Sequence, residues 1–280
     1  MSRQFLTNPD NFDIRMEFLK LQFLAIIQGL TEFLPVSSSG HLALFKILFG
    51  LEEPGNAGPL LEVLLHAGTL ISVLFFYRQR IWELLKGLIQ HDRTAWRYAL
   101  TILLSCIPAG LLYAFAGDKL EEAFSNPMVI CALLMLTGLI LLSLRWQPKR
   151  LPSGTAPNFL QAFIIGIAQA FAMLPGVSRS GSTYTTGTWL GVGSSEAFDF
   201  SFLMSLPVIG GAVLLKLRHF KELSSDGQGF GMFVALILSA VVGYFALKLL
   251  ARMRIAGKFW WFGIYCLAVG ALGLAIQLLK

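Results

Sequence analysis

Six long apolar stretches constrain this chain more than any other feature of its sequence. They lie at 59–77, 99–116, 127–144, 198–215, 229–250 and 259–280. Each is close to the length of about 20 residues with which a helix crosses a hydrocarbon core of about 30 Å. The composition agrees, since 55% of the residues are hydrophobic and only 14% are charged. We therefore predict an all-α polytopic membrane protein with six transmembrane helices in a lipid bilayer.

The charged residues predict how these spans are oriented. The net charge is +6, but the basic residues fall in short loops and form no continuous face, so we expect no nucleic-acid partner. Loops 78–98, 145–150 and 248–258 are basic, which places them in the cytoplasm. Loop 117–126 is net acidic and suits the outer side, whereas the basic loop 216–228 is an exception to the rule.

Two further hydrophobic segments, 18–50 and 159–193, do not read as ordinary spans. Each carries a proline and a run of serines, in LPVSSSGH at 34–41 and in LPGVSRSGS at 174–182. A proline interrupts the hydrogen bonds of a helix, and freed backbone groups at membrane depth must be buried in protein or line a wet cavity. We predict a re-entrant, broken helix pair in each segment.

The similarity of the two segments divides the chain into repeats within one membrane domain. A polar N-terminal segment at 1–17 precedes repeat 1 at 18–144, and a cytoplasmic linker at 145–158 precedes repeat 2 at 159–280. Each repeat holds one re-entrant pair and three spans. Because three is odd, the second pair enters the membrane from the opposite side, which predicts an inverted-topology repeat whose loops meet near the midplane.

The first loop places Glu32 and His41 around three serines, Ser37, Ser38 and Ser39. Ionisable residues inside a membrane are costly, so a functional role is the first interpretation. The alternative is that Glu32 and His41 only bind the broken backbone. Gln28 and Glu32 are one helical turn apart and offer oxygen ligands to a divalent cation, Mg²⁺ or Ca²⁺.

The second loop surrounds Arg179 with hydroxyl groups at the start of a helix, an arrangement that favours oxyanion binding. The predicted phosphate-binding residues of the two loops are Ser37, Ser39, Ser178, Arg179, Ser180 and Thr183. Together the loops suit phosphoryl transfer. The alternative for Arg179 is a purely structural pair with Glu32. Glu62 and His66, on one helix face, are either supporting groups near this site or a self-satisfied pair at the membrane surface.

Two runs of sequence, QGLTEFLPVSSSGH at 28–41 and PGVSRSGST at 175–183, resemble the signature motifs of the bacterial undecaprenyl-diphosphate phosphatase family, which is linked to bacitracin resistance. The likeness extends to 60–73 and 197–209. It implies hydrolysis of undecaprenyl diphosphate to undecaprenyl phosphate and inorganic phosphate, which recycles the carrier lipid for peptidoglycan synthesis. It also implies the cytoplasmic (inner) membrane, with the active site facing the periplasm or outer side.

The resemblance further implies residue roles. The expected catalytic residues are Glu32, Ser38, His41 and Arg179, with Gln28 and Glu32 at the cation. The nucleophile stays open between Ser38, His41 and a water molecule. A rival interpretation is a transporter or flippase for a phosphorylated isoprenoid lipid, but that function needs no pair such as Ser38 and His41. The sequence leaves the oligomeric state open and is compatible with a homo-oligomer.

Overall fold

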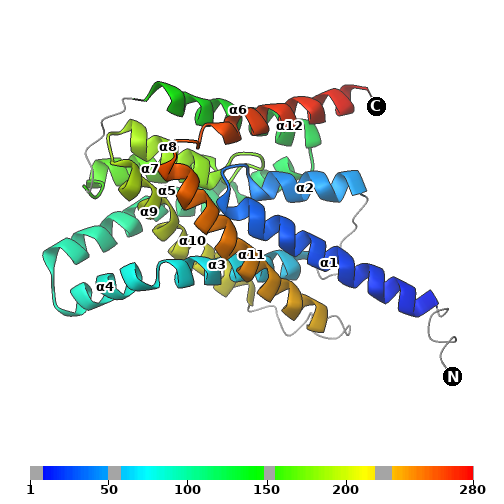
Figure 1. Ribbon diagram of the computed structural model, residues 1–280, viewed down its shortest axis with the longest axis horizontal. Coiled ribbons are helices and arrows are strands. Elements are labelled where there is room, and N and C mark those ends of the chain that lie inside the picture. Colours follow the sequence, from blue (N-terminus) through cyan, green and yellow to red (C-terminus); the bar gives the residue numbers. More distant parts are fainter. Residues whose placement is uncertain (1–8, 50–57, 148–154, 218–228, 280) are drawn as a thin grey trace.

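The computed structural model describes residues 9–49, 58–147, 155–217 and 229–279, and within these ranges every regular element is a helix (Figure 1). The elements are α1 (Pro9–Phe33), α2 (Ser38–Phe49), α3 (Gly58–Phe76), α4 (Arg78–Ile89), α5 (Arg93–Phe124), α6 (Pro127–Leu142), the short 3₁₀ helix η3 (Ser143–Trp146), α7 (Phe159–Phe171), α8 (Arg179–Trp189), α9 (Ser194–Leu203), α10 (Ser205–Leu217), α11 (Gly229–Ile255) and α12 (Trp261–Leu278). Of the described segments, five are long and apolar enough to cross a membrane, or six if the bent pair α3–α4 counts as one. The prediction of an all-α polytopic membrane protein is confirmed.

Several predicted loops are wrong in detail, because helices continue past the apolar stretches. Much of the basic loop 78–98 is helix α4, which is bent by 74° from α3. The predicted outer loop 117–126 continues α5 as far as Phe124, beyond a kink at Ala116. The N-terminal segment 1–17, predicted only to be polar, is helical from Pro9 onward. Parts of the linker 145–158 and of the basic loop 216–228 lie outside the described residues.

The bend between α3 and α4 occurs at Tyr77, whose backbone is not α-helical. Its hydroxyl group donates a hydrogen bond of 2.9 Å to Asp199 Oδ1 on α9. Asp92 then ends the turn after α4 by accepting hydrogen bonds from the backbone N–H groups of Thr94 and Ala95. A side-chain oxygen at this position satisfies the free donors that begin a helix. The amphipathic α4 therefore folds back along α5 at one end of the molecule.

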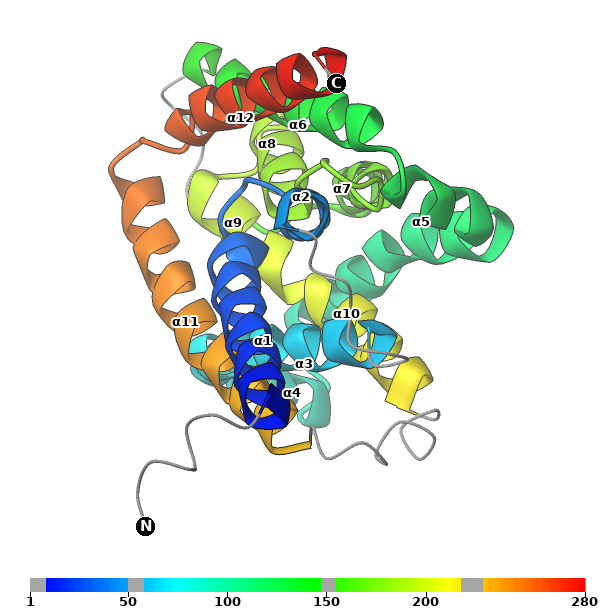
Figure 2. The ribbon, with the colours of Figure 1, turned by 90° about the vertical axis from the view of Figure 1, so that its right-hand side faces the viewer.

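Small residues allow the long helices to approach closely, as is typical of helix pairs in membranes. A methyl group added at Gly138 on α6 would lie 2.8 Å from the carbonyl oxygen of Gly263 on α12, and one added at Gly243 on α11 would meet Phe33 on α1 at the same distance. Figures 1 and 2 show α6 beside α12 and α1 beside α11. Helices α2, α7 and α8, which flank the two broken segments, lie between the α6–α12 pair and the α1–α11 pair.

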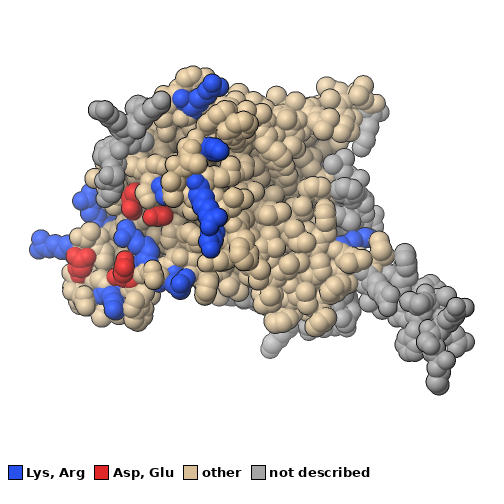
Figure 3. All heavy atoms as spheres, viewed as in Figure 1, with Lys and Arg blue, Asp and Glu red and all other residues tan. Residues whose placement is uncertain are grey.

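Charged side chains gather at the end of the molecule formed by α4, the beginning of α5, α9 and the end of α11 (Figure 3). Arg80 lies 3.7 Å from Glu196, and the guanidinium groups of Arg254 and Arg145 stack over Phe198 and Trp260. These contacts bring the described parts of the three basic loops together on one side.

Candidate active site

The first broken segment turns sharply between α1 and α2. Helix α1 ends at Phe33, Pro35 follows, and Ser37 adopts a positive φ of 69° before α2 begins at Ser38. Phe33 is fully buried in the aromatic core, where its ring lies 5.8 Å from that of Phe202. This core holds the end of α1 in place, so the polar side chains on its last turn have fixed positions.

The loops of the two broken segments make the same hydrogen bonds at corresponding residues. Ser37 Oγ accepts a hydrogen bond of 3.3 Å from the N–H of Gly40, and Ser178 Oγ accepts one of 3.2 Å from the N–H of Gly181. In each loop the same serine also lies 3.3 Å from the hydroxyl two residues on, Ser39 or Ser180. The internal similarity of the sequence therefore corresponds to a repeated local structure. The inverted relation of the two halves stays a prediction.

The two loops are in direct contact. A methyl group added at Gly40 would lie 2.9 Å from the Cα atom of Gly176, whose φ of 101° itself favours glycine. Ser37 Oγ accepts a further hydrogen bond from the N–H of Gly176. From α6, Thr137 Oγ1 donates to the carbonyl of Gly176 and accepts from the N–H of Ser178. The loops of both segments thus form one unit.

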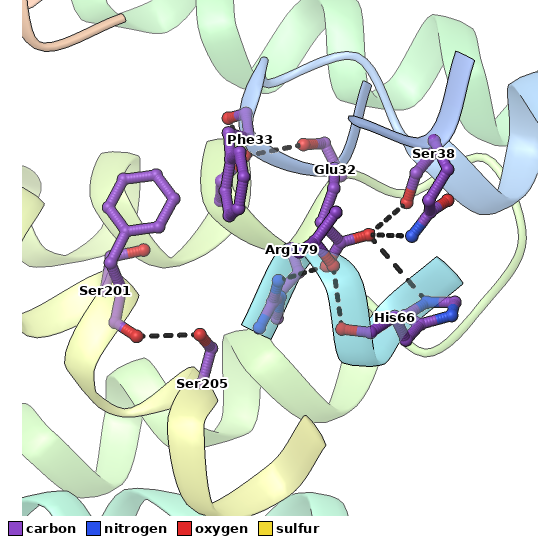
Figure 4. A network of polar contacts seen from close by, with 12 residues as sticks. Glu32, Phe33, Ser38, His66, Arg179, Ser201 and Ser205 are labelled. Carbon is purple, nitrogen blue, oxygen red and sulfur yellow. Dashed lines mark hydrogen bonds and ion pairs between the residues drawn. The ribbon is translucent and has the colours of Figure 1, made fainter. Parts of the chain in front are cut away.

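Glu32 is the centre of the polar network drawn in Figure 4. Its Oε1 atom accepts a hydrogen bond of 2.6 Å from Arg179 Nη2, which joins α1 to the first residue of α8. Its Oε2 atom accepts hydrogen bonds from Ser38 Oγ at 2.7 Å and from Gln28 Nε2 at 3.0 Å. His66 Nε2, from α3, lies 3.8 Å from the same oxygen. Residues far apart in the sequence therefore converge on one carboxylate.

This network borders a cavity of about 280 Å³. The polar residues that line it include Thr31, Glu32, Ser37, Ser38, Ser39, Glu62, His66, Ser178 and Arg179. Arg179 Nη1 is buried and has no hydrogen-bond partner among the described residues. A buried donor without a partner is costly. An oxyanion bound in the cavity, at the N-terminus of α8, would supply the missing acceptor.

The structure places His66 at the cavity and His41 outside it. His41 does not line the cavity. Its Nδ1 atom lies 2.9 Å from the carbonyl oxygen of Ser37, and its Nε2 atom lies 2.8 Å from the hydroxyl of Tyr265 on α12. His66 and Glu62 do line the cavity, which favours the interpretation of this pair as groups near the site. Nothing in the sequence around Tyr265 indicated that it contacts the first loop.

The remaining predicted phosphate ligands bind other parts of the protein. Ser180 Oγ donates to the carbonyl of Phe33, and Thr183 Oγ1 donates to the carbonyl of Arg179 and contacts the hydroxyl of Ser201. Neither lines the cavity. Their hydrogen bonds hold α8 against α1 and α9, and this fixes the position of Arg179. Ser37, Ser39 and Ser178 do reach the cavity.

The residues present fit a divalent cation only in part. Glu32 and Glu62 offer hard oxygen ligands at the cavity, and Gln28 Oε1 is buried with no partner in the described part of the chain. However, Gln28 directs its amide nitrogen at Glu32, and the described residues contain no group of three or more acidic, histidine or cysteine side chains that could hold a metal ion. A cation here would need ligands from a bound substrate.

The fold and this site define a polytopic membrane protein with a polar cavity at the junction of its two broken segments. Residues 21–272 match the model of the family described as bacitracin resistance protein BacA, and the chain belongs to this family. It is 41% identical to the undecaprenyl-diphosphatase of Methanococcus vannielii, over 87% of this chain and 94% of the relative. It is 36% identical to the undecaprenyl-diphosphatase of Bacteroides fragilis strain NCTC 9343, over 95% of this chain and the full length of the relative. These matches confirm the family resemblance.

Proposed function

We propose that this protein is an undecaprenyl-diphosphate phosphatase, which hydrolyses undecaprenyl diphosphate to undecaprenyl phosphate and inorganic phosphate. The observation that supports this most is the state of the Arg179 guanidinium at the cavity. Its Nη2 atom donates to Glu32, whereas its buried Nη1 atom has no hydrogen-bond partner among the described residues. Guanidinium groups bind phosphate oxygens through two parallel hydrogen bonds. Hydroxyl groups from both loops surround the same cavity.

The geometry favours Ser38 as the nucleophile. Its hydroxyl donates to Glu32 Oε2 at 2.7 Å, so the carboxylate is placed to accept the proton as the serine oxygen attacks the terminal phosphorus. The bond from that phosphorus to the bridging oxygen breaks, and undecaprenyl phosphate leaves. Water then attacks the phosphorus of the phosphoserine, and the bond from phosphorus to Ser38 Oγ breaks. Glu32 returns the stored proton to Ser38 Oγ, and inorganic phosphate departs with the oxygen and both protons of the water. Arg179 stabilises the charge on the transferring group.

We also propose that the reaction uses a divalent cation, Mg²⁺ or Ca²⁺. A diphosphate adds several negative charges to a cavity whose described lining already holds the carboxylates of Glu32 and Glu62 and one guanidinium, that of Arg179. A hard cation bound by Glu32 and the diphosphate oxygens would neutralise part of this charge.

The membrane setting follows from the charge of the loops. The basic end that contains Arg80, Arg145 and Arg254 faces the cytoplasm on the positive-inside rule, and the cavity opens to the periplasmic or outer side. In this orientation the enzyme lies in the cytoplasmic membrane and regenerates the carrier lipid for peptidoglycan synthesis. Removal of the diphosphate form of the lipid would confer bacitracin resistance.

The test is phosphate release from undecaprenyl diphosphate by the purified protein in detergent, with and without a chelator. We expect release that stops on chelation and returns with Mg²⁺ or Ca²⁺. A flippase for a phosphorylated isoprenoid lipid is the rival function, and it is not favoured by the undecaprenyl-diphosphatase relatives. A folded protein that binds the lipid but releases no phosphate would contradict the phosphatase and support the rival.

A further inference from the structure

Helix α10 forms an apolar wall of the cavity, opposite the polar loops. Its buried side chains Ile209 and Val213 pack against Val63 on α3. The next strip of its surface, with Val208 and Ala212, lines the cavity. On the far side of the helix, Pro207 and Leu214 are exposed, and Leu214 is 69% exposed. Exposed apolar side chains on a helix of a polytopic membrane protein are typical of a lipid-facing surface.

Gly211 lies between the cavity strip and the lipid-facing strip. Successive residues of an α-helix are rotated by about 100°, which places position 211 beside Val208 on one side and beside Pro207 on the other. A methyl group added at Gly211 would meet no atom of the described residues within 4 Å. Many other helical glycines of this chain, such as Gly68 and Gly166, would bring an added methyl group within 3 Å of a neighbouring helix. Among the described residues, Gly211 therefore borders open space, with no neighbouring helix against it.

We propose that the isoprenoid chain of the substrate leaves the cavity sideways into the bilayer by crossing α10 at Gly211. This inference rests on the proposed function and adds to it the path of the lipid. The phosphate groups lie at Arg179 and Ser38, and the first isoprene units lie on Val208 and Ala212. A side chain at position 211 would stand in the path from this apolar wall to the lipid.

The chemistry of the cavity supports this path. Its two walls differ, with hydroxyl and charged groups on the loops and aliphatic groups on α10, as an amphiphile with a phosphorylated head requires. Apolar contact with the chain is favourable in proportion to the area removed from water. A lateral exit also keeps the rest of the long chain in the hydrocarbon region while the head enters the polar cavity.

The test uses Gly211→Phe, which is expected to fold because the space at position 211 is open. The matched control is Gly110→Phe on α5, since Gly110 also has no described neighbour within 4 Å of an added methyl group and does not line the cavity. Two constants are measured at a fixed mole fraction of detergent. They are the KM for undecaprenyl diphosphate and the inhibition constant of inorganic diphosphate, which carries no chain.

We expect Gly211→Phe to raise the KM at least tenfold and to leave the inhibition constant of inorganic diphosphate within twofold, while Gly110→Phe changes neither. An unchanged KM, or an equal rise in both constants, would overturn the proposed path. If Gly211→Phe does not give a monodisperse protein, Ala212→Leu on the cavity wall replaces it with the same expectations. A wild-type protein that releases no phosphate would instead refute the proposed function, and the lipid path with it.

Discussion

Thr137 on α6 is expected to hold the second loop in the shape that catalysis needs. Its side chain is buried, and its Oγ1 atom donates to the carbonyl of Gly176 at 2.8 Å and accepts from the N–H of Ser178 at 3.0 Å. Thr137→Val keeps the shape of the side chain but leaves both backbone groups without this partner. Each buried group left unpaired costs about 1–3 kcal/mol, so we expect a total loss of about 2–6 kcal/mol.

The assay is thermal unfolding of the purified variant in detergent, followed by phosphate release below the midpoint. A loss of 1 kcal/mol lowers the midpoint by about 2–4 °C in a chain of 150–250 residues, so a decrease of at least about 4 °C is expected. Thr101→Val is the control, because Thr101 is equally buried and, within the described part of the chain, its hydroxyl bonds only the carbonyl of Tyr98 in its own helix. Equal midpoints for the two variants would refute this account of the loop.

Three further predictions concern the loops. Gly176→Ala should prevent stable folding, since the added methyl group would lie 2.5 Å from the carbonyl oxygen of Ile130 at a φ of 101°, and expression with size-exclusion chromatography would show this. Arg179→Lys should lower kcat/KM about 10- to 100-fold, because one ammonium group cannot bind Glu32 and phosphate as a planar fork does. Tyr265→Phe should lower the unfolding midpoint and reduce kcat less than about tenfold, because His41 lies outside the cavity; a loss equal to that of Ser38→Ala would show that His41 acts in the chemistry.

The sequence signals that drew attention to Glu32, Ser38 and Arg179 are local, and the structure brings these residues together. Pro35 and the serines that follow cannot lie in a lipid-facing helix, and Arg179 at the start of a helix is a costly charge at membrane depth unless it binds an anion. The spacing of Gln28 and Glu32 placed both on one helix face, and the structure joins them by a hydrogen bond. The two loops are in contact, as the repeat led us to expect, while their inverted relation and their place at the midplane stay predictions.

The rest depends on packing between distant elements, which the sequence does not encode locally. The resemblance implies a catalytic role for His41, but its contact with Tyr265 on α12, 224 residues away, cannot be read from the local sequence. The helical continuation after Tyr77 reads as a loop because the following residues are charged, whereas the contact with Asp199 that accompanies the bend is 122 residues away. The role proposed for Gly211 can be inferred only from the position of α10 beside the cavity.

The most direct test of a single site built from both loops is phosphate release from undecaprenyl diphosphate by one variant from each loop. Ser38→Ala removes the donor to Glu32 in the first loop, and Arg179→Ala removes the guanidinium of the second. The exposed residues Ser125 and Arg145 give the matched controls Ser125→Ala and Arg145→Ala. We predict that both loop variants fold and lose at least about 100-fold in kcat, while both controls retain activity. Full activity of a folded Ser38→Ala or Arg179→Ala variant would contradict the account.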